Sequence, residues 1–546
     1  GHFVKRPWLS MGFVALSIAL LMFTMAKTPT TLVPNEDTGT IMCAVTLPPG
    51  TSQDRTDKML RQVEKLVMAS PLVDNTAVVS GFSFLGGQGS SYGSFIIKLK
   101  PWEERNSVTE SSTMVFANLY LESQKAFKDA QVLFFQRPMI TGYGVSNGFS
   151  LNLQDRTGGD LTKFKKVADD FIAELIKRPE IQSAQTNFDT RFPQYTIDID
   201  AAQCKRAGLS PTDVLTTLQG YLGGLYSSNF NRFGKVYRVM VQADFADRSN
   251  IESLNNIKVR NNRGEMAPIT QFMTLTPTEG PDVISRFNMF TSIAINGNPA
   301  DGYTSGQAVK AVEEVAKSTL PVGYTYEYSG LTREEQSSGS STTGLVFVLC
   351  FVFIYLLLAA QYESYFLPFA VLLSVPFGLL GAFLFIHLMG SLGYIPGMVG
   401  KILGAIFGQA QNNIYVQISL IMLMGLLAKN AILIVEFALD RRKMGMSITA
   451  ASLHGAAARL RPILMTSMAM IIGLLPMMFA FGVGANGNRA LGTTAVGGMF
   501  IGMICQIFVV PALFRIFQGI QEHFKPIDFG DLHDADATPD LEQYTK

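Results

Sequence analysis

The stretch GLLAKNAILIVEFALDRRK, residues 425–443, decides the fold of this chain. It places Lys429 inside a segment, residues 414–437, that is otherwise largely apolar. About 20 helical residues, at about 1.5 Å each, cross a bilayer, so the segment predicts a transmembrane helix. A charged ammonium at membrane depth costs roughly 3 kcal/mol, and such residues usually pair with an acid or serve a function.

The sequence offers only one candidate partner for this lysine in the same segment. Glu436 lies seven residues further on, on roughly the same helix face but about 10 Å nearer one end. It stands beside a charged run, residues 440–443, that is typical of a water-facing edge. The other apolar segments contain no better acid. Either Lys429 extends to the membrane interface, or it pairs with a carboxylate that this chain does not contain.

Composition predicts a membrane protein with a large soluble part. The chain has 546 residues, of which 48% are hydrophobic, and its mean hydropathy is +0.23, too apolar for a purely soluble protein. A net charge of +1 gives no indication of a nucleic-acid partner. The four cysteines and five histidines show no spacing typical of a disulfide framework or a metal site, so we expect no metal.

Six apolar runs are long enough to span a membrane: residues 8–26, 343–361, 366–389, 414–439, 463–481 and 490–514. We interpret the first run as a retained helix, because a signal peptide would have a shorter apolar core and a cleavage site. When the spans alternate, most lysines and arginines near their ends fall on one side, and only Lys401 and Arg489 lie in short loops on the other. The positive-inside rule then places both termini in the cytoplasm and residues 28–342 outside.

The soluble block repeats one supersecondary unit. Strand and helix patterns recur at residues 45–67, 151–176 and 292–330, and Asp160 is a plausible N-cap in the second. This repetition predicts α+β subdomains of the split βαβ, ferredoxin-like kind. Residues 193–276 interrupt the pattern with further strands and a helix, which predicts an inserted subdomain. The loop 390–413 is Gly-rich and partly apolar, consistent with a short interfacial or re-entrant helix, and the last residues form an acidic tail.

The chain shows no hydrolase nucleophile pattern and no phosphate-binding loop, so an ion gradient is the remaining energy source for work across a membrane. The groups available for coupling are Lys429 and Asn430 in one helix and Arg459 and Thr466 in the next. Pro462 suits the first turn of that second helix. Alternatively, Arg459 is a topology anchor and Thr466 a hydroxyl that bonds its own backbone.

Aromatic residues surround a Gly-rich loop in the soluble block. Phe82, Phe84 and Phe95 flank residues 86–91, and Phe134 and Phe135 lie further along the chain. Alternating aromatics in strands usually form a core. A mobile loop flanked by phenylalanines also suits an adaptable apolar binding site, so both interpretations remain open.

Several stretches together closely resemble one family, the AcrB-type resistance-nodulation-division (RND) efflux pumps that export hydrophobic and amphiphilic compounds. The stretches are PNEDTG (34–39), LPPG (47–50), GFSF (81–84), AAQYES with the following Leu-Pro (359–368), LLAKNAILIVEFA (426–438) and RLRPILMTS (459–467). The resemblance covers nearly the whole chain. It is a resemblance to the C-terminal half of such a pump, because that family duplicates a six-helix unit with its periplasmic loop.

The resemblance implies the following assembly. A homotrimer lies in the inner membrane of a Gram-negative bacterium and works by proton antiport, without a cofactor. A missing N-terminal half contributes transmembrane aspartates on its fourth helix. A periplasmic adaptor (membrane fusion) protein and an outer-membrane channel are further partners, and small hydrophobic substrates and membrane lipids are bound.

The resemblance also implies roles for particular residues. The proton relay comprises Lys429, Arg459 and Thr466, with Asn430 beside them. The drug-pocket and switch-loop positions are Val79, Phe82, Phe84, Phe95 and Phe135. Ala77 departs from a position that is often aromatic, and the long loop 390–413 is a second departure.

The expected divisions are a first transmembrane helix (1–27), a porter subdomain (28–140), a second porter subdomain (141–192 with 277–342), a docking insertion (193–276), five transmembrane helices (343–518) and a tail (519–546). Two other functions remain possible. The chain could be a non-transporting scaffold or assembly subunit, or a related lipid or sterol carrier.

Overall fold

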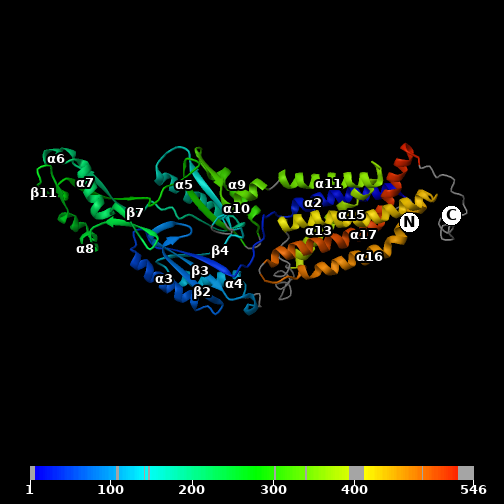
Figure 1. Ribbon diagram of the computed structural model, residues 1–546, viewed down its shortest axis with the longest axis horizontal. Coiled ribbons are helices and arrows are strands. Elements are labelled where there is room, and N and C mark those ends of the chain that lie inside the picture. The colour runs from blue at the N-terminus through cyan, green and yellow to red at the C-terminus, as the bar shows by residue number, and fades with distance from the viewer. Residues whose placement is uncertain are drawn as a thin grey trace. The chain divides into compact units, whose positions relative to one another are not determined.

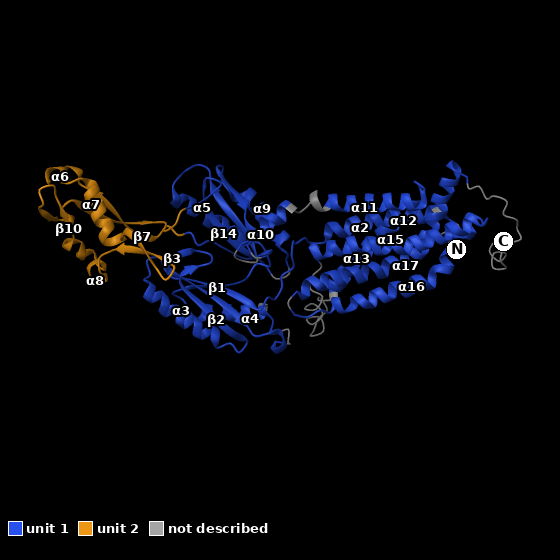
Figure 2. Cartoon of the chain, viewed as in Figure 1, with its two compact units in different colours: residues 1–188, 285–546 blue, residues 189–284 orange. Residues whose placement is uncertain are grey.

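The computed structural model describes residues 6–105, 110–140, 142–144, 148–300, 303–338, 341–392, 411–482 and 484–526. The chain divides into two compact units, residues 1–188 with 285–546 and residues 189–284 (Figure 2). Most of the predicted 390–413 loop and of the acidic tail lies outside the described residues.

The larger unit contains a bundle of long apolar helices, drawn side by side in Figure 1. They are α2 (Pro7–Lys27), α11 (Ser341–Tyr362), α12 (Leu367–Leu372) with α13 (Val375–Leu392), α15 (Ile414–Lys443), α16 (Ile448–Met478) and α17 (Ala485–Phe524). Counting α12 and α13 together, the described residues provide six spans long and apolar enough to cross a membrane. The six predicted spans are therefore confirmed.

Two helices differ from the sequence-based expectation. The span predicted at 366–389 is interrupted between α12 and α13, where Pro376, the second residue of α13, has no N–H for a preceding carbonyl. The prediction that Pro462 lies in the first turn of its helix is wrong, because α16 begins at Ile448 and Pro462 is interior. The first half of α16 is rich in alanine and contains two arginines, so its hydropathy does not reveal the helix.

Small residues allow α15 to pack deeply in the bundle. A Cβ on Gly378 of α13 would lie 1.9 Å from Leu427, and one on Gly498 of α17 would lie 2.3 Å from Leu423. Close packing through small residues is typical of helices in membranes, where apolar surface alone does not drive association. One face of α15 is therefore fixed against α13 and α17.

The first α/β region follows α2. In chain order it contains β1 (Thr40–Thr46), α3 (Gln53–Met68), β2 (Val73–Ser83), β3 (Gly87–Leu99), a 3-10 turn (Trp102–Glu104), α4 (Ser112–Ala126) and β4 (Gln131–Gln136). The sheet has the order β2-β3-β1-β4, and its neighbouring strands are antiparallel. Helices α3 and α4 cover a core that includes Leu60, Val63, Phe95 and Leu119.

The second α/β region is assembled from two distant parts of the chain. It contains β5 (Phe149–Asp155), α5 (Leu161–Ile176) and β6 (Ile181–Gln185), and then β13 (Ser285–Phe287), β14 (Phe290–Pro299), α9 (Ser305–Thr319), β15 (Tyr324–Tyr328) and α10 (Gly330–Ser338). Strand β14 pairs with β13, β5 and β6, and β15 pairs with β5. The predicted N-cap is confirmed, because the Asp160 carboxylate accepts the Thr162 N–H at 3.1 Å.

The smaller unit, residues 189–284, has its own core around Val214, Leu254 and Ile269. Its elements are β7 (Phe192–Ile199), α6 (Ala201–Arg206), α7 (Pro211–Leu218), a π-helical turn (Gln219–Gly223), β8 (Leu225–Arg232), β9 (Lys235–Val241), α8 (Phe245–Arg248), 3-10 helices (Ile251–Asn256, Ile269–Gln271), β10 (Lys258–Arg260), β11 (Met266–Pro268) and β12 (Met273–Gly280). Strands β8 and β9 form a hairpin with side chains exposed on both faces.

Candidate functional site

Helix α15 presents Lys429 on its one open face. The helix begins after Asn413, whose side chain accepts the Val416 N–H at 3.0 Å. Its exposed residues recur at intervals of four and seven, which marks a single face. They include Ile418, Gly425, Lys429, Glu436 and Asp440. Nothing lies within 4 Å of a Cβ added to Gly425, so the surface one turn before Lys429 is open.

Lys429 makes no hydrogen bond or ion pair with any residue that the structure describes. Glu436 lies about 10 Å further along the axis, at seven residues of about 1.5 Å each, and is exposed as well. The lysine is therefore in the middle of an apolar helix with its charge unbalanced by the described part of the chain.

A polar contact fixes α15 against α16 beside this lysine. The Asn430 Nδ2 donates to the Ser467 Oγ at 3.0 Å, and both side chains are buried. Lys429 and Thr466 each precede one member of this pair, so the contact brings them to the same level of the two helices. The Thr466 hydroxyl donates to the Pro462 carbonyl at 3.0 Å and to the Ile463 carbonyl at 3.2 Å. In this structure Thr466 bonds its own helix.

The two helices also approach closely nearer their charged end. A Cβ on Gly455 would lie 2.9 Å from the Ala438 Cβ, so a larger residue would separate α16 from α15. Near this contact, the Phe437 ring lies 4.8 Å from the Arg459 guanidinium and 5.0 Å from that of Arg441. The Arg459 Nε has no hydrogen-bond partner among the described residues. The aromatic ring thus holds the Arg459 guanidinium, whose Nε is buried.

The predicted aromatic site is only partly assembled. Phe82 and Phe84 are half-buried and pack edge to face, with ring centroids 5.4 Å apart. The Ser94 hydroxyl donates to the Phe82 carbonyl at 2.8 Å, which fixes this turn. Val79 is 39% exposed, whereas Phe95 is fully buried in the core beneath the sheet. Phe95 therefore supports the sheet from behind instead of facing open space.

Phe135 lies in a separate cavity of about 170 Å³. The cavity lies between the first and second α/β regions, since it is also lined by Leu85, Phe116, Asn296 and Asn298. Its wall combines aromatic side chains with amides, a combination that suits small, mostly apolar molecules. Sequence reasoning identified Phe135 but missed the amide side, which comes from β6 and β14, about 50 and about 160 residues away in the chain.

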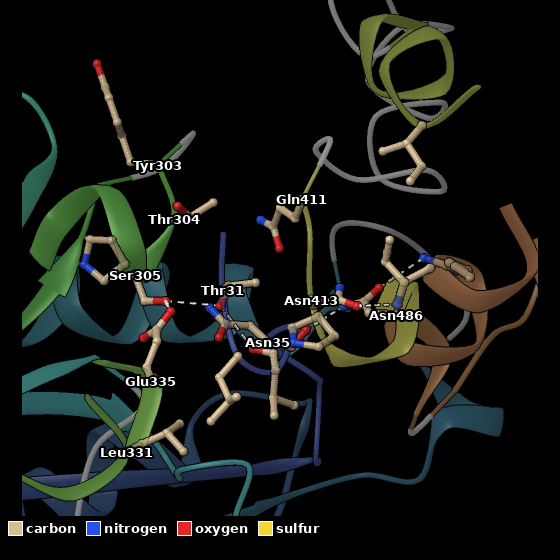
Figure 3. A pocket seen from close by; sticks show the side chains of 18 of the residues that line it. Thr31, Asn35, Tyr303, Thr304, Ser305, Leu331, Glu335, Gln411, Asn413 and Asn486 are labelled. Atoms are coloured by element: carbon tan, nitrogen blue, oxygen red, sulfur yellow. Dashed lines mark hydrogen bonds between the residues drawn. The ribbon is translucent and has the colours of Figure 1, made fainter. Parts of the chain in front are cut away.

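A larger cavity, of about 310 Å³, lies where the bundle meets the second α/β region. In Figure 3, Thr31 and Asn35 lie between Glu335 on one side and Asn413 and Asn486 on the other. Its lining combines polar and apolar residues in similar measure, and sequence reasoning missed it. The stretch PNEDTG, which contributes Pro34 and Asn35 to the lining, is the local signal for it in the sequence.

Two half-buried carboxyl groups lie here: Glu335 lines the cavity, and Glu36 follows Asn35, which also lines it. Glu335 accepts the Ser305 hydroxyl at 2.7 Å and the Leu32 backbone N–H, and burial raises its pKa above the ordinary value. Glu36 accepts the backbone N–H groups of Asn486 and Gly487 at 3.1 and 2.6 Å. Burial raises the pKa of Glu36 too, against the opposing effect of these N–H groups. Both groups are less readily ionised than exposed glutamates.

Comparisons with known proteins all match this chain to one family. The sequence profile of the AcrB/AcrD/AcrF family matches residues 1–402 and 392–518. The antibiotic efflux pump membrane transporter ArpB of Pseudomonas putida is 34% identical over 542 residues, which are 99% of this chain and 48% of that protein. The toluene efflux pump membrane transporter TtgB, also of Pseudomonas putida, is 34% identical over 532 residues, 97% of this chain and 48% of TtgB.

A relative from another genus gives the same result. The multidrug export protein AcrF of Escherichia coli is 34% identical over 513 residues, which are 92% of this chain and 47% of AcrF. The chain spans about half the length of the curated relatives it matches. Together with the six apolar helices, these matches identify a membrane protein with a large soluble region.

Proposed function

Because the chain belongs to the AcrB/AcrD/AcrF family, we propose that it is half of a proton-driven exporter of hydrophobic or amphiphilic compounds. The observation that carries this proposal is Lys429, a cation in the middle of a transmembrane helix, exposed and without an acidic partner in the described part of the chain. The names of the relatives, which include antibiotic, toluene and multidrug transporters, support the choice of substrate class.

The positive charge of Lys429 requires a negative charge to balance it. An unpaired ammonium at membrane depth costs roughly 3 kcal/mol, so Lys429 requires a carboxylate from elsewhere. Aspartates on the N-terminal half of the transporter supply it. Protons that neutralise these aspartates release Lys429, and each proton crossing 100 mV supplies about 2.3 kcal/mol. The gradient itself is the energy source, and no cofactor is needed.

The neighbouring side chains have distinct roles in this relay. Asn430 is a positioning residue, because its bond to Ser467 sets Lys429 at the level of Thr466. Thr466 exchanges its backbone bond for a contact with the relay when the aspartates change protonation. Arg459, held by Phe437, lies nearer the charged end of α15 and supplies a fixed positive charge at the cytoplasmic end of the relay.

Substrates bind in the soluble region along the aromatic residues. Phe82, Phe84 and Val79 provide accessible apolar surface, and Phe135 lines the cavity between the two α/β regions. Phe95 supports this wall from within the core. The cavity changes volume when the two α/β regions shift relative to each other, and this change moves the substrate.

The architecture proposed for the soluble part is a pair of split βαβ, ferredoxin-like porter subdomains. Its support is that corresponding strands have the same neighbours in both sheets, β2-β3-β1-β4 and β6-β14-β5-β15. Residues 189–284, which include the exposed β8–β9 hairpin, form the docking subdomain. The complete pump is a trimer in the inner membrane of a Gram-negative bacterium, surrounded by lipid, and works with a periplasmic adaptor and an outer-membrane channel.

Native mass spectrometry of the assembly, purified from membranes in mild detergent, tests the proposed half. We expect a second polypeptide, or a longer precursor, that carries acidic residues in a transmembrane helix, together with export of a fluorescent amphiphile from cells. A stable assembly of this chain alone that exports nothing would support a scaffold. Binding of sterol or phospholipid by that assembly would support a lipid carrier.

A further inference from the structure

Residues 28–36, which belong to the segment between α2 and β1 and are here called the linker, are bonded to the start of α15. The Asn412 N–H donates to the Pro29 carbonyl at 2.8 Å, and the Thr31 N–H donates to the Asn412 carbonyl at 3.1 Å. The Ile414 N–H then donates to the Leu32 carbonyl at 3.2 Å. Three backbone bonds thus tie the linker to residues 412–414, where the helix that carries Lys429 begins.

The end of the linker is bonded to α17. The Glu36 carboxylate accepts two backbone N–H groups in the first turn of that helix, those of Asn486 and Gly487. The Asn486 side chain donates in return to the Asn35 carbonyl. A carboxylate at a helix N-terminus is favoured by the unpaired N–H groups and the helix dipole. The linker therefore contacts two transmembrane helices through hydrogen bonds.

The other side of the linker is bonded to the second α/β region. The Thr31 and Ser305 hydroxyls lie 3.0 Å apart, and Ser305 donates to Glu335 at 2.7 Å. Glu335 also accepts the Leu32 N–H. A Cβ on Gly306 would lie 2.6 Å from the Thr30 carbonyl oxygen, so the linker packs directly on the start of α9. Helices α9 and α10 thus hold the linker with side chains.

Space for movement is present beside these bonds. The 310 Å³ cavity is lined by five consecutive linker residues, Thr31 to Asn35, and by residues of α10, α13, α15 and α17. A tightly packed interior transmits a displacement as a whole, whereas a segment with a cavity along one side can shift without clashing.

We propose that the linker couples α15 to the second α/β region, with Thr31, Ser305 and Glu335 as the positioning residues that transmit the movement. A displacement of α15 reaches the linker through its backbone bonds, and the linker carries it to α9 and α10. The second sheet moves with these helices because α9 packs on it through Val309 and Val312. This inference rests on the proposed function, since it supplies the step between proton transfer at Lys429 and substrate movement.

A reversible cross-link tests the linker in the complete transporter. In the variant Thr31→Cys/Ser305→Cys, oxidation joins the linker to α9, and dithiothreitol releases it. The matched control is Ser150→Cys/Ser329→Cys, whose hydroxyls lie 2.9 Å apart within the second α/β region. Because the reduced first variant has lost the hydroxyl contact, we expect its export rate to fall about tenfold and oxidation, which restores the link covalently, to recover it, while the second variant exports equally in both forms. Equal export by the oxidised and reduced forms of the first variant would overturn the proposal.

A second measurement tests the coupling independently of the cysteine variants. Hydrogen exchange is compared between wild type and Lys429→Ala in the purified assembly. We expect the substitution to change the exchange rate of the Leu32 and Ile414 amides about tenfold, while the amides of the β8–β9 hairpin stay unchanged. Unaltered exchange at Leu32 overturns the coupling role. If Lys429→Ala itself leaves export intact, the proposed function fails, and this outcome is distinct from failure of the linker alone.

Discussion

Asn430 and Ser467 are joined by a hydrogen bond, Nδ2 to Oγ at 3.0 Å, although only 4% and 1% of their surfaces are exposed. This contact lies one residue from both Lys429 and Thr466. A bond between two buried polar side chains from different helices specifies their register, because any slip would leave both groups unsatisfied. The level of the lysine relative to α16 is therefore set by its neighbour in the sequence.

Replacing Asn430 tests this role. We expect Asn430→Leu, which keeps the volume but removes the donor, to lower the free energy of unfolding by about 1 kcal/mol, as for other hydrogen bonds between membrane helices. Denaturant titration of the purified protein in detergent measures this change. Adding Ser467→Ala should cost little more, because the hydroxyl left unsatisfied is removed as well. Strictly additive losses in the double variant would show that the two side chains are not coupled.

Protonation of Glu335 should affect stability in a defined direction. Burial raises the pKa of Glu335 above its ordinary value of 4.5, with the Ser305 hydroxyl and the Leu32 N–H acting against the rise. The folded protein then binds this proton more tightly than the unfolded chain, so the contribution of Glu335 to stability is greatest at low pH. It falls as the pH rises from the ordinary towards the raised pKa.

The thermal midpoint, measured across this pH range, checks the sign. We expect Glu335→Gln to remove this part of the pH dependence. Ser305→Ala, which takes away a donor to the carboxylate, should move the window to higher pH. A midpoint that rises with pH in the wild type and falls in Glu335→Gln would contradict the assignment.

The aromatic residues of the first α/β region separate into two classes. Phe95 is fully buried, so Phe95→Ala should cost about 3–5 kcal/mol of stability and reduce the amount of folded protein. Phe84 is half-buried, so Phe84→Ala should cost about 1 kcal/mol and mainly weaken export of large apolar compounds. Export rate per folded molecule, together with a melting curve for each variant, distinguishes binding from stability. Normal export of every substrate by Phe84→Ala would remove that residue from the pocket.

The periodicity of the sequence predicted the membrane spans well because each span is decided by local hydropathy. The first half of α16 was missed for the same reason, since Ala456, Ala457, Ala458, Arg459 and Arg461 lower the apolar average without disfavouring a helix. The interruption before Pro376 was also missed, although a proline in the middle of an apolar run is a usable signal.

The candidate site was harder to predict from the sequence than the fold. Lys429 is conspicuous in the sequence because a charge in an apolar run is rare. The bonds around the linker join residues far apart in the chain, such as Leu32 with Glu335 and Glu36 with Gly487. No local pattern predicts such pairs, because they depend on how the bundle and the α/β regions meet.

In the proposed mechanism, Lys429 is a proton-coupled charge whose partner lies outside this chain. Simultaneous measurement of proton flux and amphiphile export, in proteoliposomes with an imposed pH gradient and the complete assembly, tests it most directly. The control is Lys443→Ala, an exposed lysine in the last turn of the same helix. We predict that Lys429→Ala reduces both fluxes to background while Lys443→Ala stays near wild type. Export by Lys429→Ala at the wild-type rate would contradict the account.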